Sequence, residues 1–98
     1  MTITRTLAAV QRTKEYQSLI DAGLQMVSTD RQLQNGTLAF TGKVQKGRKT
    51  LRPSYKVTAN GAVISNEFVA RRVTGTGVAA YRQGLEAVQE ILEKRLAA

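Results

Sequence analysis

The chain has 98 residues, a formal net charge of +8, and near-average shares of hydrophobic (42%) and charged (22%) side chains. These proportions predict one folded domain over residues 1–98, not a disordered chain. Cysteine and histidine are absent, which excludes disulfides, zinc fingers and histidine-based acid–base catalysis, so we expect no metal and no cofactor. The sequence has no apolar run near the roughly 18 residues of a membrane span, and we expect a cytoplasmic protein without a membrane partner.

Residues 4–27 predict a first helix, because apolar side chains recur there near the 3.6-residue period. Thr13, Lys14 and Glu15 interrupt this apolar stripe and indicate a bend or break in the middle. The "STD" sequence at 28–30 is expected to end the helix.

The next forty residues change to a period of two, which is typical of strands. We predict three antiparallel strands, at residues 37–45, 50–58 and 62–72. Turn signals precede the first strand ("NG" at 35–36) and separate the second from the third ("ANG" at 59–61). Pro53 lacks an N–H donor, so the second strand should lie at an edge or begin after the proline.

Residues 78–98 return to a helical pattern, with Val78, Tyr81, Leu85, Val88 and Leu92 forming one apolar seam. Thr76 is the expected N-cap of this helix. The predicted fold class is therefore α+β: a two-layer sandwich of helix, three-stranded antiparallel sheet and helix (α-β-β-β-α). Both helices should cover the apolar face of the sheet and leave the other face in water.

The positive charge is concentrated in the middle of the chain. Residues 31–72 carry nine basic side chains against one acid, Glu67, whereas the segments on either side are neutral. Segregated charge of this kind creates a potential that attracts polyanions. The candidate nucleic-acid-binding residues are Lys43, Lys46, Arg48, Lys49, Arg52, Lys56, Arg71 and Arg72.

The strand pattern predicts where these cations lie. Lys43, Arg52, Lys56 and Arg71 alternate with apolar residues and should occupy the outward face of the sheet. The loop "QKGRKT" at 45–50 adds Lys46, Arg48 and Lys49 at one end of the sheet. Gly47 would let this loop approach a phosphate backbone closely. The alternative interpretation is a solvated strand face whose charges only prevent edge-to-edge aggregation.

Other motifs are weaker. "GKVQKGRKT" spaces Gly42 and Gly47 as a P-loop does, but Arg48 intrudes before Lys49 and a strand, not a helix, follows. "TGTG" at 74–77 leads into the last helix and could bind an anion, although a simple capped turn is the favoured interpretation. The aromatic residues Phe40, Tyr55 and Phe68 share the apolar phase, so we expect them in the core and not stacked on bases. Tyr16 and Tyr81 should pack between helix and sheet.

The predicted order of helix, three strands and helix is similar to that of the double-stranded RNA-binding domain. That family has a lysine cluster at the start of its last helix. This sequence has "GTGVAAYRQG" there, with Arg82 as the one basic residue. The resemblance is therefore one of topology, and the family's RNA contacts through that cluster are not carried over.

Three functions remain open. The first is a non-catalytic binder of DNA or RNA that uses the basic residues above. The second is an interaction or assembly module whose basic face meets an acidic protein partner, or a homo-oligomer for which Ile91 and Leu96 could seed an interface. The third is a small ribonuclease without histidine, in which Arg or Lys would stabilise the phosphate and Tyr would donate a proton; loss of RNA cleavage in a Tyr55→Phe or Arg52→Ala variant would support it.

Overall fold

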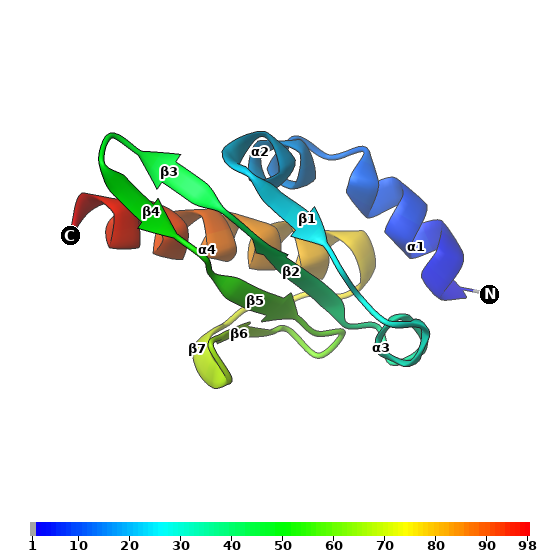
Figure 1. Cartoon of the computed structure of the whole chain (residues 1–98). Helices are drawn as coiled ribbons and strands as arrows, with labels where there is room; N and C mark the ends of the chain where they lie inside the picture. Colours follow the sequence, from blue (N-terminus) through cyan, green and yellow to red (C-terminus); the bar gives the residue numbers. More distant parts are fainter. Residues whose placement is uncertain (1) are drawn as a thin grey trace.

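The computed structural model describes the backbone of residues 2–98 and the side chains of residues 5–98. The fold is α+β, with antiparallel strands and helices (Figure 1). The helices are α1 (Thr2–Gln11), α2 (Lys14–Ala22), α3 (Asp30–Gln34) and α4 (Gly77–Ala97). The strands are β1 (Leu24–Met26), β2 (Leu38–Gly42), β3 (Val44–Lys46), β4 (Lys49–Leu51), β5 (Ser54–Val57), β6 (Ala62–Ser65) and β7 (Phe68–Arg72).

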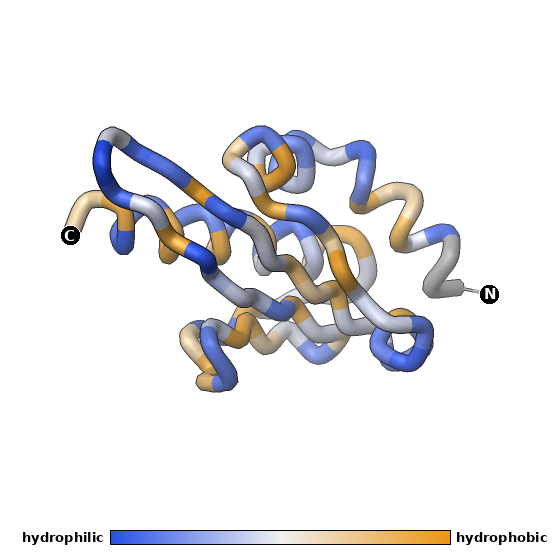
Figure 2. The backbone as a smooth tube through the Cα atoms, viewed as in Figure 1, coloured by the Kyte–Doolittle hydropathy of each residue, from blue (hydrophilic) through white to orange (hydrophobic). Residues whose placement is uncertain are grey.

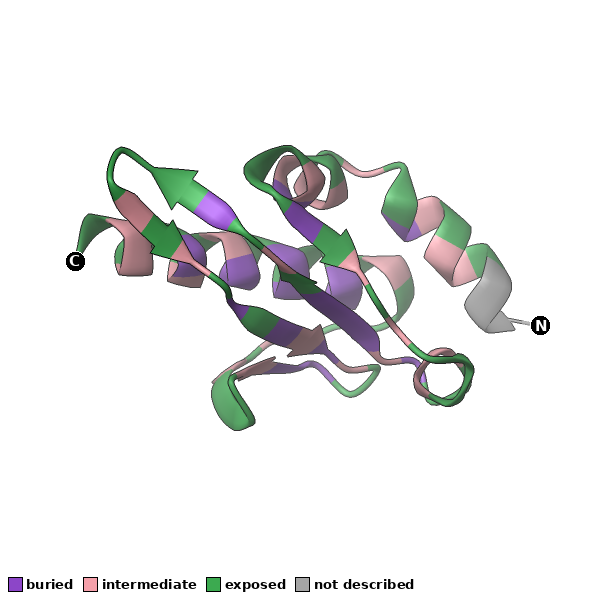
Figure 3. Ribbon diagram, viewed as in Figure 1, coloured by how far each residue is buried: buried purple, intermediate pink, exposed green. Residues whose placement is uncertain are grey.

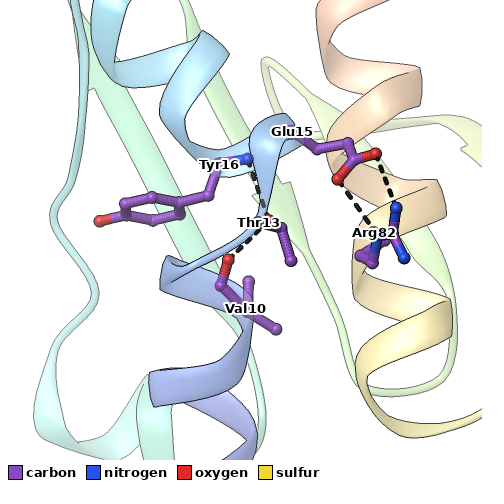
Figure 4. Close-up of polar contacts among 5 residues, drawn as sticks. All are labelled: Val10, Thr13, Glu15, Tyr16 and Arg82. Carbon is purple, nitrogen blue, oxygen red and sulfur yellow. Dashed lines mark hydrogen bonds and ion pairs between the residues drawn. The ribbon is translucent and has the colours of Figure 1, made fainter.

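The predicted first helix is broken in the middle, as its pattern indicated. α1 ends at Gln11, and Thr13 is the N-cap of α2. The Thr13 hydroxyl accepts a hydrogen bond from the Tyr16 N–H at 3.2 Å and donates to the Val10 carbonyl oxygen at 2.6 Å (Figure 4). One side chain therefore caps the second helix and ties it to the end of the first.

The prediction that this helix continues to Val27 was wrong. Gly23 adopts the left-handed conformation (φ 112°) that ends a helix, and β1 follows at once. The "STD" segment stops no helix but starts a new one, because Thr29 and Gln32 form a reciprocal capping box at the start of α3.

The main sheet has five strands in the order β1-β2-β5-β6-β7, and β3 and β4 form a separate two-stranded ribbon. The predicted three-stranded sheet is therefore wrong in strand number. The segment predicted as one third strand folds into two, because Asn66 and Glu67 both adopt positive φ (50° and 74°) in a two-residue turn between β6 and β7. The antiparallel arrangement was predicted correctly.

The strands β2 to β5 form one long hairpin, residues 38–57. In every Cα pair of β2 with β5 and of β3 with β4, the two residue numbers add up to the same value, 95. The register is thus unchanged across the break at Lys43, Arg52 and Pro53. The predicted alternation is confirmed, because Leu38, Phe40, Val44, Pro53, Tyr55 and Val57 are buried.

Helices α1, α2 and α4 lie together on one face of the sheet, with α4 behind the strands in Figure 1. The core between them joins Val10 and Leu19 from the helices near the N-terminus to Leu85 and Val88 of α4 and to the inward side chains of the strands. Burial is concentrated along α4 and the central strands (Figure 3). Phe68 is an exception, because its side chain is 77% exposed and the prediction that it belongs to the core was wrong.

Candidate nucleic-acid interface

The outward face of the long hairpin carries three of the candidate cations. Lys43 and Arg52 face one another in the register of the hairpin, and both are exposed. Lys56 lies further along the same face, between Ala39 of β2 and Ile64 of β6. The sequence prediction that these three side chains point away from the core is confirmed.

Arg71 does not join this face, although its phase in the sequence predicted that it would. A register shift between Val63 and Ile64 changes the pairing of β6 with β7, so Arg71 lies opposite Val63, which is fully buried. Its guanidinium then reaches the helix side and forms an ion pair with Glu90 of α4. This hydrogen bond lowers the pKa of Glu90 below its ordinary value.

Arg72 lies on the outward side instead, one residue further along β7. It pairs with Ala62, which shares the outward phase of Ile64 and Lys56. Its side chain is exposed. The register shift is a β-bulge, and it exchanges the positions of the two arginines. Arg72 therefore takes the outward position predicted for Arg71.

Lys46 and Lys49 face one another in the last rung of the ribbon, on the side of the helices. Like charges directly opposite in a sheet repel each other. Lys49 relieves this repulsion by turning to the C-terminal end of α4, where its Nζ donates to the Arg95 carbonyl oxygen at 3.1 Å and also to the carbonyl of Ala98. Lys46 stays exposed.

Arg48 lies at the tip of the hairpin, in the two-residue turn with Gly47. Gly47 has a φ of 61°, and a side chain added there would meet no atom within 4 Å. The space that a Gly47 side chain would occupy is therefore open, and a ligand can approach the backbone of the tip from that side. Figure 2 shows hydrophilic stretches on both sides of the hairpin tip, where the tube itself is pale.

The carboxylates that form ion pairs belong to the helices. Over the described side chains, two ion pairs join acids to bases: Arg71 with Glu90, and Arg82 with Glu15 at 3.2 Å. The second pair joins α4 to α2 (Figure 4), and its hydrogen bond lowers the pKa of Glu15 and raises that of Arg82. Within residues 5–98, none of the outward cations of the hairpin is neutralised by a carboxylate.

Four further polar residues lie on the outward face, and none of them was named as a candidate site residue from the sequence. Thr41 pairs with Ser54 and Gln45 pairs with Thr50 in the same register. The Gln45 amide donates to the Thr50 hydroxyl at 3.3 Å, and the Thr41 hydroxyl donates to the Pro53 carbonyl at 3.1 Å. Their outward position could have been predicted from the alternation of the strands, because each lies two residues from an outward cation.

Tyr55 and Arg52 do not share a site. Tyr55 is fully buried, and its hydroxyl accepts a hydrogen bond from Arg95 at 3.3 Å, whereas Arg52 lies on the opposite face of the strand. A proton donor and a phosphate-stabilising group would have to lie on the same face. The arrangement postulated for a ribonuclease is therefore not assembled by these two residues.

Two shallow hollows lie away from the hairpin. One, of about 250 Å³, is lined by Glu15, Arg82 and Glu86, and the other, of about 280 Å³, by Gly36, Gly77 and Tyr81 with their neighbours. The described side chains include no acidic cluster that could hold a metal ion. Among residues 2–98, no helix has the length and apolar character needed to cross a bilayer.

Comparison with protein-family models, with curated proteins and with solved structures found no match.

Proposed function

We propose that the chain is a non-catalytic nucleic-acid-binding protein that contacts backbone phosphates with the outward face and the tip of the 38–57 hairpin. The observation that carries this proposal is the grouping of the exposed Lys43, Arg48 and Arg52 with the half-buried Lys56 on one surface, where none of them forms an ion pair with a described carboxylate. Such a surface attracts polyanions and neutralises their phosphates.

Lys46 and Arg72 flank this surface and can add to the same field. Lys49 and Arg71 already have partners within the molecule, the end of α4 and Glu90. We therefore expect these two residues to contribute less to binding than the outward cations.

The test is a salt titration of binding to labelled DNA and RNA fragments. Each phosphate contact on duplex DNA adds about −0.9 to the log–log slope of affinity against salt. The double variant Lys43→Ala/Arg52→Ala should therefore flatten the slope by about 1.8.

The matched control is Arg12→Ala/Lys14→Ala, which removes the same charge from exposed positions at the junction of α1 and α2. This control should leave most of the slope unchanged. Equal effects of the two double variants would mean that net charge, not the hairpin surface, governs binding. Salt-insensitive binding, or none, would exclude the proposed function.

A second candidate function is self-association through β7. This strand is the last one of the sheet: one of its edges pairs with β6 and the other pairs with no described strand. It exposes Phe68 (77%) and Val69 (53%). Exposed apolar edge strands pair readily with another strand. Ile91 and Leu96, in contrast, pack partly against the core and offer less free surface. Gel filtration of the chain and of a Phe68→Ser/Val69→Thr variant tests this candidate, because a dimer held by β7 should dissociate in the variant.

A further inference from the structure

We infer that the β3–β4 ribbon enters the major groove of duplex DNA, an inference that rests on the proposed function and names its ligand. The first observation is a change in width along the sheet. β1 pairs with the hairpin as far as Gly42, and β6 as far as Tyr55. Beyond these residues the sheet narrows from five strands to the two strands of the ribbon.

This width fits one groove and not the other. Four strand spacings make the main sheet about 19 Å across, whereas the axes of two strands are about 5 Å apart. The major groove of B-form DNA is about 12 Å wide and admits a two-stranded ribbon, whereas the minor groove, about 6 Å wide, leaves almost no room for the backbone and side chains on either side of two strand axes. The wide part of the sheet must then stay outside, where Lys56 and Arg72 can meet phosphates beside the groove.

Single strands are disfavoured by the position of the aromatic side chains. Proteins that bind single strands stack bases on exposed aromatic rings. Phe40 and Tyr55 of the hairpin are buried on the side of the helices, and the exposed Phe68 lies at the β6–β7 turn, away from the ribbon. The outward face of the hairpin consequently offers charge and hydrogen bonds but no stacking platform.

The outward side chains of the ribbon have the chemistry that base edges require. Gln45 and Thr50 lie in the centre of the ribbon, and Lys43 and Arg52 form the next outward pair. Amide and hydroxyl groups such as those of Gln45 and Thr50 read base edges in the major groove, and Lys43 and Arg52 keep the phosphate contacts proposed above. In duplex RNA this groove is deep and too narrow for side chains to read, so DNA is the favoured duplex.

The test compares two DNA duplexes that differ only in the major groove. Both have the same mixed sequence with 5-hydroxymethylcytosine in place of cytosine, and in one of them these bases are glucosylated, which fills the groove and leaves the phosphates unchanged. We expect glucosylation to weaken binding at least about fivefold, the lower end of what one base contact contributes. Duplex RNA and single-stranded DNA of equal length should also bind more weakly than the DNA duplex without glucose.

Two variants locate the effect on the ribbon. Gln45→Ala/Thr50→Ala should reduce the difference between the two duplexes. The control Thr41→Ala/Ser54→Ala changes the equivalent pair on the wide part of the sheet and should leave the difference intact. Equal affinity for both duplexes, combined with salt-sensitive binding, would overturn this inference and leave the proposed function standing. Absence of binding to every polymer would overturn both.

Discussion

The ammonium group of Lys49 donates a hydrogen bond to the carbonyl oxygen of Arg95, 3.1 Å away and 46 residues later in the chain. This contact fastens the far end of the hairpin to the last turn of α4. A cation at a helix C-terminus also interacts favourably with the helix dipole. Lys49 thus has a structural role that its position in a basic loop did not predict.

The first prediction concerns this contact. Lys49→Met should lower the free energy of unfolding by about 0.5–1.5 kcal/mol, the usual contribution of one hydrogen bond. The measurement is urea denaturation. Lys46→Met is the matched control, because it lies in the same rung without a hydrogen bond to α4 among the described contacts, and it should be neutral or slightly stabilising. An equal loss of unfolding free energy in both variants would contradict the stabilising role of the contact between Lys49 and α4.

The second prediction compares two glycines with positive φ, Gly36 (76°) and Gly47 (61°). Alanine at either position has the same backbone penalty, about 1–2 kcal/mol. At Gly36 the added methyl group would also lie 2.7 Å from the Cβ of Ala59 and 2.9 Å from the Tyr81 hydroxyl, whereas at Gly47 it would meet nothing. Gly36→Ala should therefore destabilise the fold by about 1–3 kcal/mol more than Gly47→Ala. Thermal denaturation of the two variants side by side checks the difference, and equal melting temperatures would refute it.

The third prediction concerns acid stability. Hydrogen bonding to Arg82 lowers the pKa of Glu15 in the folded chain below its ordinary value of 4.5. A carboxyl group with a depressed folded pKa stabilises the fold above its unfolded pKa, and this contribution disappears as the pH falls through the folded pKa. Glu15→Gln should therefore reduce stability at pH 7 and have little effect near pH 2.

Urea unfolding at both pH values provides the measurement for Glu15. The effect should be small, because the Arg82 side chain is 55% exposed and exposed ion pairs contribute little. Asp21→Asn in the same helix is a suitable comparison, because Asp21 accepts a hydrogen bond from Gln17 and forms no ion pair within the described residues. A larger loss for Glu15→Gln at pH 2 than at pH 7 would show that the sign is wrong.

The fourth prediction contrasts the two phenylalanines. Phe40 is almost fully buried and contacts Tyr16 edge to face, with ring centroids 6.0 Å apart, whereas Phe68 is largely exposed. Phe40→Ala should cost about 3–5 kcal/mol, and Phe68→Ala should stay within about 0.5 kcal/mol of the parent chain. Denaturant titration of both variants checks this. A large loss at Phe68 would indicate that β7 is covered in solution.

Much of the fold could be predicted from periodicity. The alternation in residues 37–58 placed Phe40 and Tyr55 inward and Lys43, Arg52 and Lys56 outward, because a half-buried strand requires this pattern. α4 was predicted over nearly its whole length, since its apolar seam is uninterrupted. Tyr81 packs as expected, and its hydroxyl donates to the Gly36 carbonyl.

The elements that were missed are short or depend on tertiary contacts. β1 has three residues and no period of its own, and it exists because it can pair with β2. The turn at Asn66 and Glu67 lacks glycine, so the local sequence carried only one sign of a sharp reversal, Asn66, a residue type that tolerates positive φ. The bulge that exchanges Arg71 and Arg72 arises from the pairing of β6 with β7. Alternation along one strand cannot show such a shift.

The unbroken register of residues 38–57 also limits how this molecule can vary in length. An insertion in one strand alone would turn the returning strand over, moving Tyr55 and Val57 into water and Arg52 and Lys56 into the core. Matched insertions, with one residue added to each strand, would avoid this inversion. The hairpin can thus be extended or shortened in steps of about 3.3 Å per added pair, and its reach can evolve while the five-stranded sheet beneath it stays the same.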